Sequence, residues 1–116
     1  GNMLCETNEL VECAEPIVFR VQQDQRLFPA FAIRYRGVVR AYLNVCAHVG
    51  LPLDGRRGKF WYLDKNYLGC VHHGAIFDPE TGECLRGPCL GLSLVPLETS
   101  EVGGHVLFVD TKYRLA

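Results

Sequence analysis

The sequence predicts an all-β fold built from antiparallel strands. Its apolar residues occur in short runs rich in β-branched and aromatic side chains, as at residues 17–21 and 59–63. Six prolines and twelve glycines lie between these runs, which is typical of short strands joined by tight turns. Long segments with helical periodicity are absent, and we expect at most one helical turn, near residues 11–14.

The turn residues predict how these strands connect. Arg36-Gly37 separates apolar runs at 30–35 and 38–44 and fits a two-residue hairpin. Pro and Gly at 78–82 indicate a second turn, between strands at 75–77 and 83–85. Further strands are expected at 67–71, at 94–98 and, after a Gly103-Gly104 turn that closes a hairpin with 94–98, at 105–110.

Composition indicates one globular domain. The chain has 116 residues and a net charge of −1, with 48% hydrophobic residues. Balanced charges argue against a nucleic-acid-binding surface, and no apolar run is long enough to span a bilayer. Residues 1–15 are acidic and carry no lysine or arginine, unlike a signal peptide. We therefore expect a cytoplasmic protein without membrane contacts.

Two short Cys/His segments predict a metal centre. One reads Cys46-Ala47-His48, and 22 positions after His48 comes Cys70-Val71-His72-His73. Zinc accepts two cysteines and two histidines, usually as a Cys pair and a His pair. Here each segment mixes the two residue types, which suits a two-iron cluster with two cysteines on one iron and two histidines on the other.

These segments resemble the Rieske [2Fe–2S] family. The likeness includes residues 46–50 and 70–78, Thr81-Gly82, and Gly87-Pro88, which is similar to the family's proline loop. It extends roughly over residues 38–97. The resemblance implies an antiparallel β sandwich or barrel with a small inserted cluster-binding subdomain at about 45–91. The flanking segments would form the basal β part of a single domain over residues 1–116.

The resemblance also implies a ligand set. Cys46 and Cys70 would bind the inner iron, and His48 and His73 the outer iron, with their rings near the surface. His72 competes with His73 by spacing, but the family places a glycine after the ligand, and Gly74 follows His73. The 21 residues between His48 and Cys70 exceed the usual number and indicate a longer hairpin near residues 60–67.

The remaining candidate residues have ordinary explanations. His105 is expected at the surface. Cys84 and Cys89 flank Gly87-Pro88 and are either thiols packed near the cluster or a disulfide. Cys5 and Cys13 are expected to be thiols or small apolar fillers. The basic group Arg56, Arg57 and Lys59 is a solvated turn or a docking patch for an acidic redox partner.

By the resemblance, the first functional hypothesis is a small Rieske-type ferredoxin. It would carry one electron between a reductase, expected to use flavin, and an oxygenase. The second is an accessory small subunit of a larger redox enzyme such as nitrite reductase, and the third a non-catalytic zinc or interaction module. Rieske oxygenases add an iron held by two histidines and a carboxylate, and only His72 and His105 remain for it. No catalytic residues are therefore expected, and the oligomeric state is left open.

The residues around the motif predict a low reduction potential. Leu51 and Val71 or His72 stand where high-potential members form a loop disulfide. Ala75 and Phe77 stand where those members have hydroxyls that donate to sulfur. Without these hydrogen bonds the oxidised cluster is harder to reduce, so we expect a potential of about −150 mV. A redox titration measures it, and a midpoint potential well above 0 mV would contradict the prediction.

Overall fold

The computed structural model describes residues 2–45, 61–62, 67–69, 76–87 and 90–116. Their regular elements are strands and one turn of 3-10 helix, η1. No helix among these residues has the length and apolar character needed to cross a membrane. The elements are β1 (Met3–Glu6), η1 (Thr7–Glu9), β2 (Ile17–Gln23), β3 (Arg26–Tyr35), β4 (Val38–Leu43), β5 (Trp61–Tyr62), β6 (Tyr67–Gly69), β7 (Ile76–Phe77), β8 (Cys84–Arg86), β9 (Pro96–Leu97), β10 (Thr99–Val102), β11 (His105–Phe108) and β12 (Arg114–Leu115).

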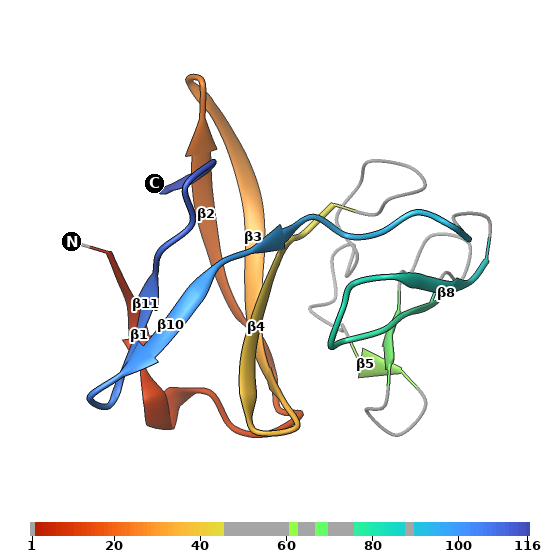
Figure 1. Cartoon of the computed structure of the whole chain (residues 1–116), viewed down its shortest axis with the longest axis horizontal. Coiled ribbons are helices and arrows are strands. Elements are labelled where there is room, and N and C mark those ends of the chain that lie inside the picture. The colour runs from red at the N-terminus through yellow and green to blue at the C-terminus, as the bar shows by residue number, and fades with distance from the viewer. Residues whose placement is uncertain (1, 46–60, 63–66, 70–75, 88–89) are drawn as a thin grey trace.

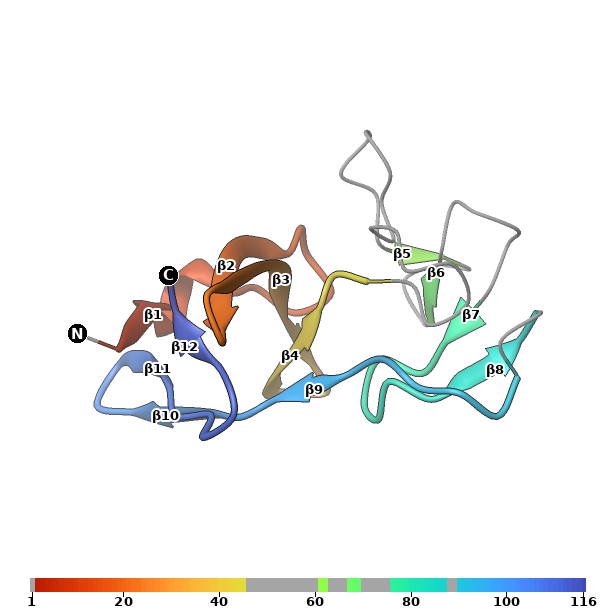
Figure 2. The same ribbon diagram turned by 90° about the horizontal axis from the view of Figure 1, so that it is seen from above.

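Three antiparallel sheets make up the fold. Their strand orders are β12-β2-β3-β4-β9, β1-β11-β10 and β5-β6-β7-β8. The first two sheets form one body, the base, which carries both termini, and the third sheet lies beside it next to β4 and β9 (Figures 1 and 2). This arrangement confirms the predicted all-β antiparallel fold.

Strands β3 and β4 form the centre of the base, and their hairpin has the predicted turn. Arg36 and Gly37 have φ angles of 52° and 78°. Two consecutive left-handed residues are the geometry of a two-residue hairpin whose twist matches its strands. The Glu12 carboxylate accepts hydrogen bonds from both backbone N–H groups of this turn, at 2.5 Å from Arg36 and 2.8 Å from Gly37. Those contacts lower the pKa of Glu12, Gly37 contributing most.

Both faces of the β3–β4 hairpin are buried. Ala32 lies opposite Ala41 on one face, and Phe31 lies opposite Tyr42 on the other. The alanine face packs into a core with β11, where Phe108 meets Phe19 edge to face at 5.9 Å. The other face contacts a different part of the chain, since the Tyr42 hydroxyl donates to the Pro79 carbonyl. Buried core residues of the base are Cys5, Leu10, Val21, Ala30, Ala32, Val39, Ala41, Leu43, Leu97, Val106 and Phe108.

Two details of the sequence prediction were wrong. The helical turn lies at Thr7–Glu9, where the Glu9 carboxylate accepts the Glu6 N–H at 2.6 Å, instead of at 11–14. In residues 11–14, Glu12 forms a β-bridge with Arg34 of β3, and Cys13 has a φ of 53°.

The closing hairpin joins β10 and β11 instead of 94–98 and 105–110. Gly103 and Gly104, with φ angles of 58° and 82°, form a two-residue turn that pairs Val102 with His105. The strand before this turn must therefore end at Val102, and β9 pairs with β4. Short strands β1 and β12 were not anticipated.

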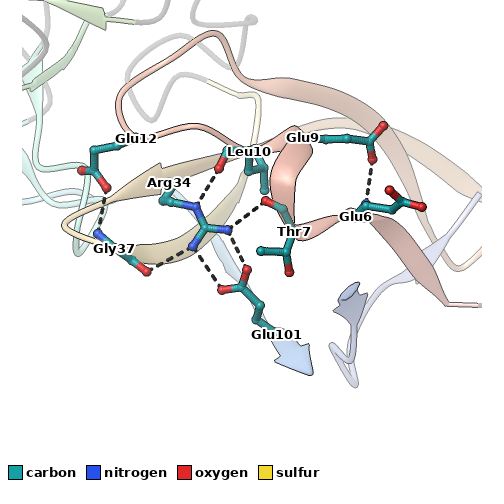
Figure 3. A network of polar contacts seen from close by, with 8 residues as sticks. All are labelled: Glu6, Thr7, Glu9, Leu10, Glu12, Arg34, Gly37 and Glu101. Carbon is teal, nitrogen blue, oxygen red and sulfur yellow. Dashed lines mark hydrogen bonds and ion pairs between the residues drawn. The ribbon is translucent and has the colours of Figure 1, made fainter. Parts of the chain in front are cut away.

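Arg34 on β3 joins three segments of the base (Figure 3). Its guanidinium donates to the backbone carbonyls of Leu10 at 2.7 Å, Thr7 at 3.2 Å and Gly37 at 3.1 Å. It also donates two hydrogen bonds to the Glu101 carboxylate, at 2.6 and 3.1 Å. The Arg34 side chain is 14% exposed. Its hydrogen bonds to Leu10 and Thr7 are partly buried, while those to Gly37 and Glu101 are exposed. Arg34 thereby fastens the N-terminal segment and β10 to the central hairpin.

Replacing Arg34 by methionine is expected to lower the free energy of unfolding by about 1.5–3 kcal/mol, because charge-assisted hydrogen bonds are lost. The pKa of Glu101 is lowered chiefly by the hydrogen bond from Arg34. This ion pair therefore stabilises the fold above the ordinary glutamate pKa, and the stabilisation disappears as the pH falls through the lowered pKa of Glu101. Urea unfolding at neutral and acidic pH measures both effects.

Arg20→Met is the control, because Arg20 is exposed on β2. Equal stability losses in the two variants, or a loss in Arg34→Met that does not shrink in acid, would contradict this role.

Candidate metal centre

All four predicted ligands, Cys46, His48, Cys70 and His73, lie outside the described residues. The structure describes the strands from which their segments begin and to which they return. The first segment follows β4, and the second connects β6 to β7. Gly69 and Ile76, the residues on either side of the second segment, are paired in the antiparallel ladder. That segment therefore begins and ends at adjacent positions of one sheet.

The strands on either side of the second segment carry apolar, buried residues. Leu68 and Phe77 are fully buried and lie opposite each other, and Ile76 is almost fully buried. Phe77 is the residue that the sequence identified as lacking a hydroxyl donor. Two thiolates and two imidazoles are a donor set that fits a two-iron cluster. Buried apolar residues on the strands that flank the second segment fit such a cluster as well, since a hydrophobic surrounding limits access of water.

The turn between β7 and β8 has the predicted form. Asp78 accepts the Gly82 N–H at its carbonyl, at 2.7 Å, and donates its own N–H to the Glu83 carbonyl at 2.9 Å. The Asp78 carboxylate also accepts the Glu80 N–H at 2.8 Å. Gly82 has a φ of 80°, in the region that favours glycine. Residues 78–82, called the Asp78 turn below, are thus fixed by their own backbone contacts.

Hydrogen bonds also join the described residues on either side of Pro88 and Cys89, which themselves lie outside the described residues. The Leu90 N–H donates to the Gly87 carbonyl at 3.2 Å, and the Cys84 N–H donates to the Leu92 carbonyl at 2.9 Å. Cys84 is 1% exposed and is a thiol that donates to the Arg86 carbonyl at 3.3 Å. Cys84 is thus a free thiol, whereas the sequence left open whether it pairs with Cys89.

Tyr42 on β4 is a connection that sequence reasoning missed. Its side chain is 2% exposed, and its hydroxyl donates to the Pro79 carbonyl at 2.8 Å. Burial raises the pKa of Tyr42, so the hydroxyl stays protonated and remains a donor. An aromatic residue in a strand gave no signal of this long-range contact. Tyr42 joins the strand that leads to Cys46 with the turn that follows His73.

The other predicted residues are dispersed. His105 is exposed on β11, as expected. Cys5 is a buried thiol whose pKa is raised mainly by burial. His72 and the basic group Arg56, Arg57 and Lys59 lie outside the described residues. Within the described part of the chain, no group of three or more His, Cys, Asp or Glu side chains could hold a metal ion.

Comparison with solved structures gives the same fold. The ferredoxin of carbazole 1,9a-dioxygenase from Nocardioides aromaticivorans IC177 superposes with a TM-score of 0.71 at 21% identity, over 96% of this chain and 97% of that one. The Sphingomonas yanoikuyae B1 ferredoxin gives 0.68 at 23% identity, over 96% and 99%. An oxygenase–ferredoxin complex of carbazole 1,9a-dioxygenase gives 0.71 at 19% identity, but this chain spans only 27% of the matched chain.

Sequence comparison settles the family. No curated protein sequence matches this chain. A family model described as the Rieske [2Fe-2S] domain matches residues 2–99, which include both Cys/His segments and the proline loop. The chain therefore belongs to the Rieske [2Fe–2S] domain family, whose cofactor is a [2Fe–2S] cluster.

Proposed function

We propose that this protein carries single electrons through its [2Fe–2S] cluster, from a reductase to a terminal acceptor such as an oxygenase. The observation that carries the proposal is the match to two ferredoxins over nearly their whole length, 97% and 99%. The match also extends over 96% of this chain in both cases. We infer that it has no catalytic activity alone.

Cys46 and Cys70 are the proposed ligands of one iron, and His48 and His73 of the other. The pairing of Gly69 with Ile76 supports this set, because it brings together the two ends of the segment that carries Cys70 and His73. The bound cluster would supply a one-electron couple. Neutral imidazoles in place of two thiolates reduce the negative charge on the centre and raise its potential above that of a four-cysteine cluster.

Residues 45–91 are the proposed cluster-binding subdomain, and the partner is proposed to dock on it. Leu85, Leu90 and Leu92 are exposed beside the proline loop, Leu90 by 69%. Exposed leucines that are close in sequence are suited to burial against another protein.

The net charge of −1 argues against nucleic acid as a partner. Cys5 and Cys84 are free thiols, which supports the proposal of a reducing, cytoplasmic location.

A second candidate is an electron-entry subunit or domain of a larger redox enzyme. The same fold occurs within longer chains, since this protein covers 33% of dicamba monooxygenase at a TM-score of 0.69 and 23% identity. In that role the electron would pass to a catalytic centre in the same assembly. Co-purification with a large subunit would distinguish this candidate from a diffusing carrier.

Replacing His48 or His73 by cysteine tests the proposed function. Each change adds a negative thiolate, so the potential should fall or the cluster should be lost. The rate of electron transfer from a flavin-dependent reductase to a Rieske oxygenase should fall with it, by roughly tenfold or more. Redox titration, EPR and stopped-flow spectroscopy measure these three quantities.

His105→Cys is the matched control, because it introduces the same thiol at an exposed position of β11. It should keep the wild-type spectrum, potential and rate. Unchanged spectra and rates in the His48 and His73 variants would refute the ligand set. A wild-type cluster that no reductase can reduce would refute the electron-carrier role.

A further inference from the structure

Two buried groups connect the strands that flank the proposed ligand segments. Tyr42 on β4 lies four residues before Cys46, and Pro79 in the Asp78 turn lies six residues after His73. Both side chains are fully or almost fully buried, and the Tyr42 hydroxyl donates to the Pro79 carbonyl at 2.8 Å. This hydrogen bond joins residues 37 positions apart in the sequence.

The Tyr42 ring also fixes the position of the same turn. It lies 5.9 Å from the Phe31 ring on one side. On another side it meets Gly82 so closely that an added Cβ would lie 2.8 Å from Tyr42 Cε1 and 3.3 Å from Leu94 Cβ. Gly82 also has a φ of +80°, which disfavours other residues. The turn therefore sits against the ring with no space for a side chain.

The returning chain completes this contact. The Leu94 N–H donates to the Gly82 carbonyl at 2.8 Å, and the Leu43 N–H donates to the Val95 carbonyl at 3.0 Å. Leu94 is almost fully buried. β4, the Asp78 turn and the segment before β9 are thus held to one another by hydrogen bonds and close packing around Tyr42.

We infer that Tyr42 is a positioning residue for the cluster: by holding the Asp78 turn against β4, it sets the separation of the two strands that lead into the first ligand segment and out of the second. The inference rests on the proposed ligand set. Ligands must be held within fractions of an ångström by their supporting residues to define a metal centre, and such supporting contacts change its properties when they are lost. The Tyr42 contacts that link β4 to the Asp78 turn are buried. The Arg40–Glu80 ion pair joins the same two segments at 3.8 Å, but its side chains are 34% and 43% exposed.

Tyr42→Phe is the decisive variant, because it removes the hydroxyl and keeps the ring. The Pro79 carbonyl then loses a buried donor. We expect broader EPR lines or displaced g-values and a shifted midpoint potential. A chelator should also remove the cluster about tenfold faster. Tyr113→Phe is the control, because it removes a hydroxyl from the segment before β12, at the opposite end of the base, and should leave all three quantities unchanged.

A second pair of variants tests the ring contact. Gly82→Ala and Gly104→Ala impose the same backbone strain, since their φ angles are +80° and +82°. Only the alanine at 82 would press on the Tyr42 ring, because nothing lies within 4 Å of a Cβ at 104. Gly82→Ala should therefore reproduce the EPR and potential changes of Tyr42→Phe, and Gly104→Ala should not.

Wild-type EPR spectra and potentials in Tyr42→Phe and Gly82→Ala would overturn the inference, even if both variants melted at lower temperature. That outcome would make Tyr42 a contributor to stability alone and would leave the proposed function intact. A wild-type protein without a Rieske EPR signal would instead refute the proposed function.

Discussion

The burial of both faces of the β3–β4 hairpin is the constraint on which the rest of the structure depends. One face carries Ala32 and Ala41 and packs against the sheet that contains β11. The other face presents Tyr42, whose hydroxyl donates a hydrogen bond to the Pro79 carbonyl. A buried carbonyl without a donor costs about 1–3 kcal/mol, so this contact is specific for one placement of the Asp78 turn. The hairpin thereby fixes the position of the β5–β8 sheet relative to the base.

The opposite end of the same hairpin is fastened by charged groups. Arg34 joins the N-terminal segment and β10 to β3, while Glu12 accepts both N–H groups of the Arg36-Gly37 turn. Strand β4 is therefore held at its start by the turn and near its end by Tyr42. A strand held at both ends is suited to position the proposed ligand segment that follows it, because metal ligands must be held closely in place by their supporting residues.

Local chemistry was predictable from the sequence, and long-range pairing was not. Arg36-Gly37, the Asp78 turn and the Cys/His segments depend on residues that are adjacent in the chain, and the first two adopt the predicted conformations. The helical turn was misplaced because the side chain of Glu9 selects its position. Strands β1 and β12 are short and lie at sheet edges, so no alternation marks them. The partner of Tyr42 lies 37 positions away, and nothing in the sequence near either residue specifies it.

The central claim is that this chain holds a two-iron cluster with mixed cysteine and histidine ligands. Metal and acid-labile sulfide analysis of the purified protein, combined with EPR of the reduced form, tests it most directly. We expect about two irons and two sulfides per chain and the rhombic signal of a Rieske centre. One zinc per chain, with neither sulfide nor an EPR signal, would contradict the claim and identify a structural zinc module instead.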